Sequence, residues 1–168
     1  MIRKYRGKVP VIHPSAFVSE AAYIVGEVEI GENSGIWPGT IIRGDSGDII
    51  IGKNTNIQDN CVVHTDHHAN IGDNVTLGHA AVSHASIIER FCLIGNNATL
   101  NEGVEVGEYS LVAANSVVLE GVKIPPKSLV VGVPAKIITS VKQRHIDLIK
   151  STAEIYVKKA QSFKEEGL

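Results

Sequence analysis

The sequence is poor in cysteine, in aromatic residues and in excess charge of either sign. Its 168 residues include two cysteines, 5% aromatic residues and 16 Lys+Arg against 18 Asp+Glu, for a formal net charge of −2. Two cysteines cannot supply the several crosslinks of a small disulfide-rich secreted domain. A nearly neutral chain also lacks the positive field that captures nucleic acid or anionic lipid. We therefore expect neither nucleic acid nor a membrane surface as a partner.

Long apolar runs are absent as well. No stretch approaches the ~20 apolar residues that a transmembrane helix needs, and the segment MIRKYRGKVPVI lacks the apolar core of a signal peptide. These absences predict a cytoplasmic protein without a membrane segment.

What the sequence does contain is an aliphatic residue at nearly every sixth position. Helices repeat about every 3.6 residues and strands every two, so neither explains this period. A chain that makes a short strand and a corner every six residues closes a triangular coil in about eighteen, and stacked coils pair as parallel strands. Residues 1–139 are therefore predicted to be an all-β domain, a parallel β-helix of hexapeptide repeats. The series with inward side chains is Ile12, Val18, Ile24, Ile30, Ile36, Ile42, Ile51, Ile57, Val63, Ile71, Leu77, Ile88, Ile94, Leu100, Val106, Val112, Val118, Ile124 and Val130.

The period changes near the C-terminus. After Val130, the segment VGVPAK ends the repeats, with Pro134 blocking their continuation. Residues 140–168 are predicted to form a C-terminal α-helix packed on the outside of the β-helix, because their apolar residues recur at helical spacing. Those residues are Val141, Leu148, Ile149, Ile155, Tyr156, Ala160 and Phe163.

The repeat is irregular in three places. Nine residues separate Ile42 from Ile51 and eight separate Val63 from Ile71. Residues 44–48 and 65–70 are therefore predicted to bulge from the prism as loops, which commonly carry function on a rigid scaffold. Only five residues separate Leu77 from Val82, which predicts a local distortion beside two histidines.

Histidines gather around these irregularities. Three imidazoles with an open fourth position are typical of a catalytic zinc site. Val63 and Val82 lie three sides apart, so His64 and His84 fall on nearly the same face, one coil apart, and can share a metal. His79 belongs to the preceding side of the triangle, and a neighbouring subunit would have to supply it. The five clustered residues are His64, His67, His68, His79 and His84.

The remaining reactive residues have simpler interpretations. His67 and His68 fall in the second predicted loop, as either surface residues or proton carriers. His13 and His145 are expected to be solvated. Cys61 and Cys92 occupy the small-residue position of their repeats and are expected to fill the core.

At these motifs the chain resembles the γ-class carbonic anhydrase family, within the hexapeptide-repeat (left-handed β-helix) superfamily. The matching motifs are Arg43-Gly44-Asp45, then Asn56-Ile57-Gln58-Asp59 running to His64, and then His79 to His84. The resemblance implies a left-handed coil and a homotrimer with a metal at each interface. It implies Zn²⁺, or Fe²⁺ or Co²⁺, bound by His64 and His84 of one chain and His79 of the next. A metal-bound hydroxide would then hydrate CO₂ to bicarbonate.

The resemblance also implies roles for residues that are not ligands. Gln58 would orient the metal-bound hydroxide, and Asn56 would hold Gln58 or the substrate. Arg43 and Asp45 would form an ion pair between subunits or, with equal weight, a purely structural salt bridge. Tyr156 matches a tyrosine of the family's C-terminal motif and is a further catalytic candidate.

The chain departs from the family pattern at two points. Ser46 and His67 stand where the most active members carry glutamates for proton transfer, and His67 or His68 is predicted to carry the proton instead. Lys158 replaces the asparagine that normally follows two residues after the tyrosine.

Three other functions remain open. A metal-dependent acyl-CoA thioesterase would keep the same metal site. A hexapeptide-repeat acyltransferase would need one histidine as a base and no metal. A catalytically silent structural trimer would keep the site for stability. Metal content separates the acyltransferase from the others, whereas CO₂ hydration and CoA-ester hydrolysis separate the rest.

Overall fold

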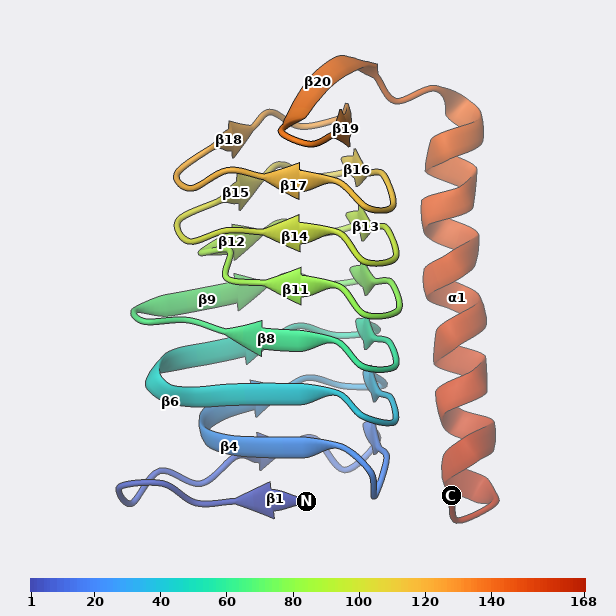
Figure 1. Ribbon diagram of the computed structural model, residues 1–168. Coiled ribbons are helices and arrows are strands. Elements are labelled where there is room, and N and C mark those ends of the chain that lie inside the picture. The colour runs from blue at the N-terminus through green and yellow to red at the C-terminus, as the bar shows by residue number, and fades with distance from the viewer.

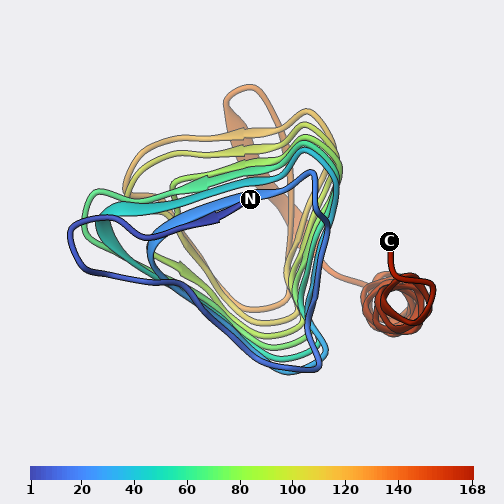
Figure 2. The same ribbon diagram turned by 90° about the horizontal axis from the view of Figure 1, so that it is seen from below.

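The computed structural model describes all 168 residues as a left-handed parallel β-helix of about seven turns with one helix beside it (Figure 1). Seen along its axis, the chain traces stacked triangles, and the helix α1 (Gln143–Glu165) stands outside one side (Figure 2). The predicted fold class is therefore confirmed.

Two sheets make up the three sides of the triangle. One contains the order β17-β14-β11-β8-β6-β9-β12-β15-β18, with β4 beside β6, and covers two sides because β4 and β6 continue around a corner. The other has the order β20-β19-β16-β13-β10-β7-β5-β3 and faces α1. The strands are β1 (Ile2–Arg3), β2 (Val11–Ile12), β3 (Phe17–Val18), β4 (Tyr23–Ile30), β5 (Gly35–Ile36), β6 (Ile41–Ile51), β7 (Asn56–Ile57), β8 (Val62–His64), β9 (His68–Ile71), β10 (Thr76–Leu77), β11 (Val82–Ser83), β12 (Ile87–Ile88), β13 (Leu93–Ile94), β14 (Thr99–Leu100), β15 (Glu105–Val106), β16 (Leu111–Val112), β17 (Val117–Val118), β18 (Lys123–Ile124), β19 (Ser128–Gly132) and β20 (Ala135–Ser140).

The sixth-position aliphatic residues form the core. Ile24 pairs with Ile42, which pairs with Val63 on the next coil, so that each inward side chain stacks on its equivalent. From Ile24 to Val130, every member of the predicted series is at most 3% exposed. Burying one such side chain is worth roughly 1.5–3 kcal/mol, and the stack therefore forms a rigid support for the residues outside it.

The prediction of a distortion at Val82 is wrong. Val82 pairs with Val62 and points outward at 39% exposure, whereas Ser83 pairs with Val63 and is 2% exposed. The six-residue spacing from Leu77 thus continues to Ser83, and the shortened step follows between Ser83 and Ile88. A search for aliphatic residues does not identify position 83 as buried, because the residue there is a serine.

The two predicted bulges also differ from expectation. Residues 44–48 bulge relative to β4 as predicted, but they belong to the continuous strand β6 and do not form a loop. The second insertion is a loop only over residues 65–67, because β9 begins at His68.

A strand that belongs to no repeat closes the C-terminal end of the coil, and the helix lies against one side. β20 pairs antiparallel with β19 and covers the end of the coil, beyond the turn that contains Pro134. The predicted C-terminal helix is confirmed as α1, which buries Ile149, Ala153 and Ala160. Its aromatic contacts join Tyr156 and Phe163 of α1 to Phe17 and Trp37 of the β-helix. No helix in the structure combines the length and the apolarity that crossing a membrane requires.

Candidate metal centre

His64 and His84 form the closest pair of potential metal ligands. His64 ends β8, and His84 directly follows β11 on the next coil. Since Ser83 pairs with Val63, the two histidines stack in register. The Nδ1 atom of His64 lies 2.6 Å from the Nε2 atom of His84, and the His64 side chain is 13% exposed. Zinc binds imidazole nitrogen at about 2.0–2.1 Å, so a slight separation of the two rings would admit a metal.

A carboxylate orients the first of these histidines. Asp45 of β6 places Oδ1 3.1 Å from His64 Nε2 and Oδ2 2.7 Å from Arg43 Nη1. When His64 Nε2–H donates to Asp45, Nδ1 carries no proton and its lone pair points toward His84. Metal-ligating histidines are commonly oriented by such a carboxylate. Arg43 and Asp45 pair within the chain, and their predicted role between subunits stays a prediction.

His79 lies at the other edge of the same side of the prism. The turn that contains Ala80, whose φ is 57°, and the strand β11 separate it from His84, and His79 is not among the residues whose ligand atoms lie within 4.8 Å of one another. Its Nδ1 lies 2.8 Å from Asp59 Oδ2 and its Nε2 lies 3.5 Å from the Tyr156 hydroxyl. Asp59 therefore favours the tautomer that leaves Nε2 available, as Asp45 does for His64 Nδ1. One metal cannot contact His79 and His84 of the same chain.

Gln58 and Asn56 lie at the same edge as His79. Gln58 Nε2 donates to Asn56 Oδ1 over 3.0 Å, and Asn56 Nδ2 donates to Thr76 Oγ1 over 2.9 Å. Both amide side chains are buried on the sheet that faces α1. Hydrogen bonds thus fix the amide orientation of Gln58 before any ligand arrives.

The predicted site residues therefore form two separate groups. We call them the His64 group (Arg43, Asp45, His64 and His84) and the His79 group (Asn56, Gln58, Asp59, His79 and Tyr156). Each contains histidine supported by a carboxylate, and the two groups occupy opposite edges of one side of the prism. Sequence reasoning assigned no role to Asp59, although it directly follows Gln58 in the recognised motif.

His67, in the loop after β8, and His68, the first residue of β9, lie outside both groups. His67 has an 84% exposed side chain with Nε2 3.6 Å from Glu102 Oε1. His68 pairs with Asp48 through an Nδ1–Oδ2 distance of 2.7 Å. Neither contacts His64 or His84 directly, and Glu102 could not be linked to His67 from their positions in the sequence.

Burial decides the state of three other ionisable groups. Desolvation raises the pKa of Cys61 and of Cys92 to about 12. Since the thiolate is the form that attacks substrates and binds metals, neither cysteine is suited to such a role near neutral pH. Burial, followed by the charge of Asp59, raises the pKa of Tyr156. Its phenol therefore stays protonated at neutral pH and can donate a hydrogen bond.

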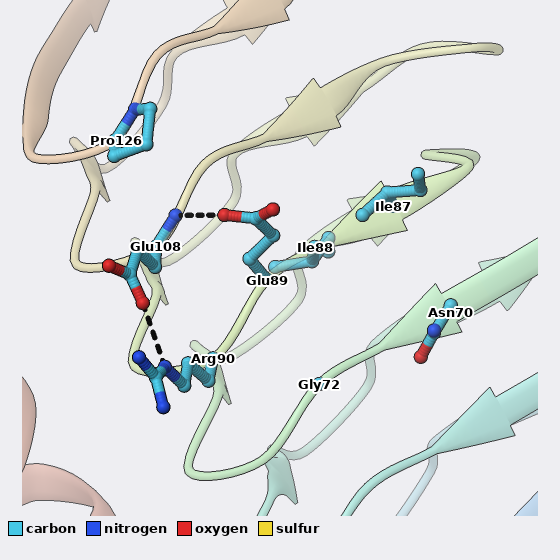
Figure 3. Close-up of a pocket in the computed structure, with 8 residues that line it drawn as sticks. All are labelled: Asn70, Gly72, Ile87, Ile88, Glu89, Arg90, Glu108 and Pro126. Carbon is cyan, nitrogen blue, oxygen red and sulfur yellow. Dashed lines mark hydrogen bonds and ion pairs between the residues drawn. The ribbon is translucent and has the colours of Figure 1, made fainter.

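A surface hollow elsewhere on the prism lacks these features. Residues of β12 and of the turns beside it line this hollow (Figure 3). Arg90 Nε lies 2.7 Å from Glu108 Oε2, and the Glu108 backbone N–H donates to Glu89 Oε2 over 2.7 Å. Arg90 thus pairs with Glu108, Glu89 accepts from a backbone amide, and no histidine lines the hollow. The lining residues are Asn70, Gly72, Ile87, Ile88, Glu89, Arg90, Glu108 and Pro126.

Comparisons with known proteins agree with the fold and with the motifs. Residues 85–120 match the family model "Bacterial transferase hexapeptide (six repeats)". A carbonic anhydrase of Geobacillus kaustophilus is 42% identical over 166 residues, which are 98% of this chain and 91% of that protein. The mitochondrial gamma carbonic anhydrase 1 of Arabidopsis thaliana is 38% identical over 168 residues, which are 95% of this chain and 61% of the longer plant protein. A solved Bacillus cereus structure, provisionally described as an acetyltransferase, has a TM-score of 0.94 and 37% identity over 98% of this chain and 96% of that chain. This chain belongs to the γ-class carbonic anhydrase family of hexapeptide-repeat proteins.

Proposed function

We propose that this protein is a zinc-dependent carbonic anhydrase that hydrates CO₂ to bicarbonate at sites between the chains of a homotrimer. Fe²⁺ and Co²⁺ suit the same nitrogen donors. The observation that carries the proposal is the presence of two half-sites, His64 with Asp45 and His79 with Asp59, at opposite edges of one side. Cytoplasmic location stays a prediction from the sequence.

An apolar strip beside the His64 group supports assembly. Ile41 pairs with Val62, which pairs with Val82, and all three side chains point outward from the prism. Ile41 and Val82 are 38% and 39% exposed, and α1 covers a different side. An uncovered apolar strip marks a surface that associates with another protein. A cyclic trimer would bury this strip and bring the His79 group of one chain against the His64 group of the next.

The metal would be held by His64 and His84 of one chain and by His79 of its neighbour. Zn²⁺ bound by neutral imidazoles lowers the pKa of its bound water from 15.7 to about 7 and so supplies hydroxide at neutral pH. Asp45 and Asp59 hold the histidines in their ligating tautomers. Arg43 in turn holds Asp45 through the 2.7 Å ion pair.

The remaining polar residues would position the substrate and solvent. Gln58 shares an edge with His79, so both would come from the same neighbouring chain. Asn56 fixes the Gln58 amide through the 3.0 Å hydrogen bond, which prepares Gln58 to orient a reacting oxygen. Tyr156 stays a neutral phenol because its pKa is raised, and its hydroxyl is available as a donor beside His79.

His67 is proposed to carry the proton from the site to buffer. Its side chain is 84% exposed, and the carboxylate of Glu102, 3.6 Å away, is the charged group that faces it. We expect His67→Ala to lower kcat about 10-fold or more while leaving kcat/KM nearly unchanged, since proton removal follows CO₂ hydration. Stopped-flow hydration in dilute buffer would measure kcat and kcat/KM separately, and added imidazole should restore kcat. A variant with wild-type kcat in dilute buffer would contradict this role, and His68→Ala is the matched control.

Metal content together with CO₂ hydration tests the proposed function. The purified protein should contain about one metal per chain, lose hydration on chelation and regain it with Zn²⁺. A metal-free protein that acetylates an acceptor from acetyl-CoA would instead support the acyltransferase. A metal-loaded protein that hydrolyses acyl-CoA but does not hydrate CO₂ would support the thioesterase, and one with neither activity would support a structural trimer.

A further inference from the structure

We propose that Asp66 is an additional ligand of the metal, able to hold it within a single chain together with His64 and His84. This inference rests on the metal centre of the proposed function. Ligand atoms of His64, Asp66 and His84 all lie within 4.8 Å of one another. They form the one group of three or more His, Cys, Asp or Glu residues in the chain that is close enough to share an ion.

The position of Asp66 suits it to this role. It lies in the loop of residues 65–67 directly after β8, two residues beyond His64, and is exposed at the mouth of the histidine pair. Its carboxylate makes no hydrogen bond or ion pair with the protein, whereas Asp45 is already engaged by both Arg43 and His64. Asp66 is therefore the carboxylate that can turn toward a metal without breaking an existing contact.

The chemistry of the set is appropriate to a divalent metal. Two imidazoles and one carboxylate bind Zn²⁺ in several hydrolytic sites and Fe²⁺ in oxygenases, leaving positions open for other ligands. The carboxylate also adds a negative charge beside the cation, which neutral histidines do not. A single chain would then retain a metal before a neighbouring subunit brings His79.

The experiment compares Co²⁺ binding by His79→Ala, Asp66→Asn and the double variant. Titration calorimetry and the visible absorption of bound Co²⁺ would follow binding without reference to activity. We expect His79→Ala to bind Co²⁺ about 10- to 100-fold more weakly than the wild type, and the double variant to bind at least about 10-fold more weakly still. Asp66→Asn alone should change affinity only a few-fold, because His79 completes the site. Asp48→Asn, in the neighbouring strand, is the control for the loss of one negative charge.

Two results would overturn the inference. One is equal Co²⁺ affinity in His79→Ala with and without Asp66→Asn, and the other is complete loss of binding in His79→Ala alone. Failure of the proposed function looks different. In that case the wild type binds no metal, or His79→Ala retains wild-type affinity and CO₂ hydration, whatever residue stands at position 66.

Discussion

Replacing His84 with alanine is expected to strip the metal from the protein and to reduce CO₂ hydration by more than about 100-fold. His84 Nε2 lies 2.6 Å from His64 Nδ1, and these two atoms form the core of the half-site. Removing a residue that only supports a ligand costs about 10- to 100-fold in metal affinity or activity. The loss of a direct ligand that no other side chain replaces should exceed that range, and neither Asp66 nor His79 restores a site with three histidines.

Metal analysis and stopped-flow hydration on the same preparation would measure both effects. His13→Ala is the control, since His13 contacts only Ser15 through its ring and lies outside both site groups. Full metal content together with wild-type hydration in His84→Ala would show that the His64 group is not the metal centre.

Replacing Val82 with aspartate is expected to convert the trimer into single chains and to abolish hydration with it. Val82 lies in the apolar strip with Ile41 and Val62, and its side chain would be buried between chains. An unpaired charge buried at an interface costs about 3–5 kcal/mol, and a closed trimer repeats the substitution at three contacts. Since the strip faces outward from the prism, the fold of each chain should persist.

Light scattering after size-exclusion chromatography would give the mass of the assembly, and circular dichroism would verify the fold. Ile87→Asp is the matched control, because Ile87 is 38% exposed against 39% for Val82. Ile87 lies in β12, which pairs with β15, and its side chain points outward from a different side of the prism. A Val82→Asp variant that remains trimeric and active would place the contact surface elsewhere.

The fold was largely predictable because one physical requirement repeats along the chain. Each coil needs an aliphatic side chain inside every side, so residues such as Ile94, Val112 and Val130 recur at regular spacing and stack in register. Ser83 breaks the pattern without breaking the coil, because a small polar residue fits the same inward position. The antiparallel strand β20 was also missed, since it closes the end of the prism and belongs to no repeat.

The site was predictable only in part. The proximity of His64 and His84 follows from the repeat spacing, which places the two residues one coil apart on the same face. The two positions fall in exact register once Ser83 is recognised as the inward residue that pairs with Val63. The supporting contacts could not be predicted, because Asp59 with His79 and Asp45 with His64 depend on the side-chain rotamers of neighbouring coils. The sequence did not predict Asp66 as a ligand for a related reason, since only the loop conformation brings its carboxylate near the histidines.

The arrangement links assembly to chemistry in a simple way. Each chain carries both half-sites, but the rigid prism holds His79 in the turn before β11 and His84 directly after β11. Neither the His64 group nor the His79 group therefore supplies three histidine ligands within one chain. Under the proposed function, the metal would acquire three histidine ligands only after the chains associate.

Complementation between two inactive variants tests this division most directly. Chains carrying His84→Ala and chains carrying His79→Ala would be produced together with different tags, and trimers with both tags would be purified. Each such ring contains one interface at which an intact His64 and His84 pair meets an intact His79, so hydration should return to about one third of the wild-type rate. Parallel preparations of each variant alone should stay inactive. Mixed trimers as inactive as the separate variants would contradict a site shared between chains.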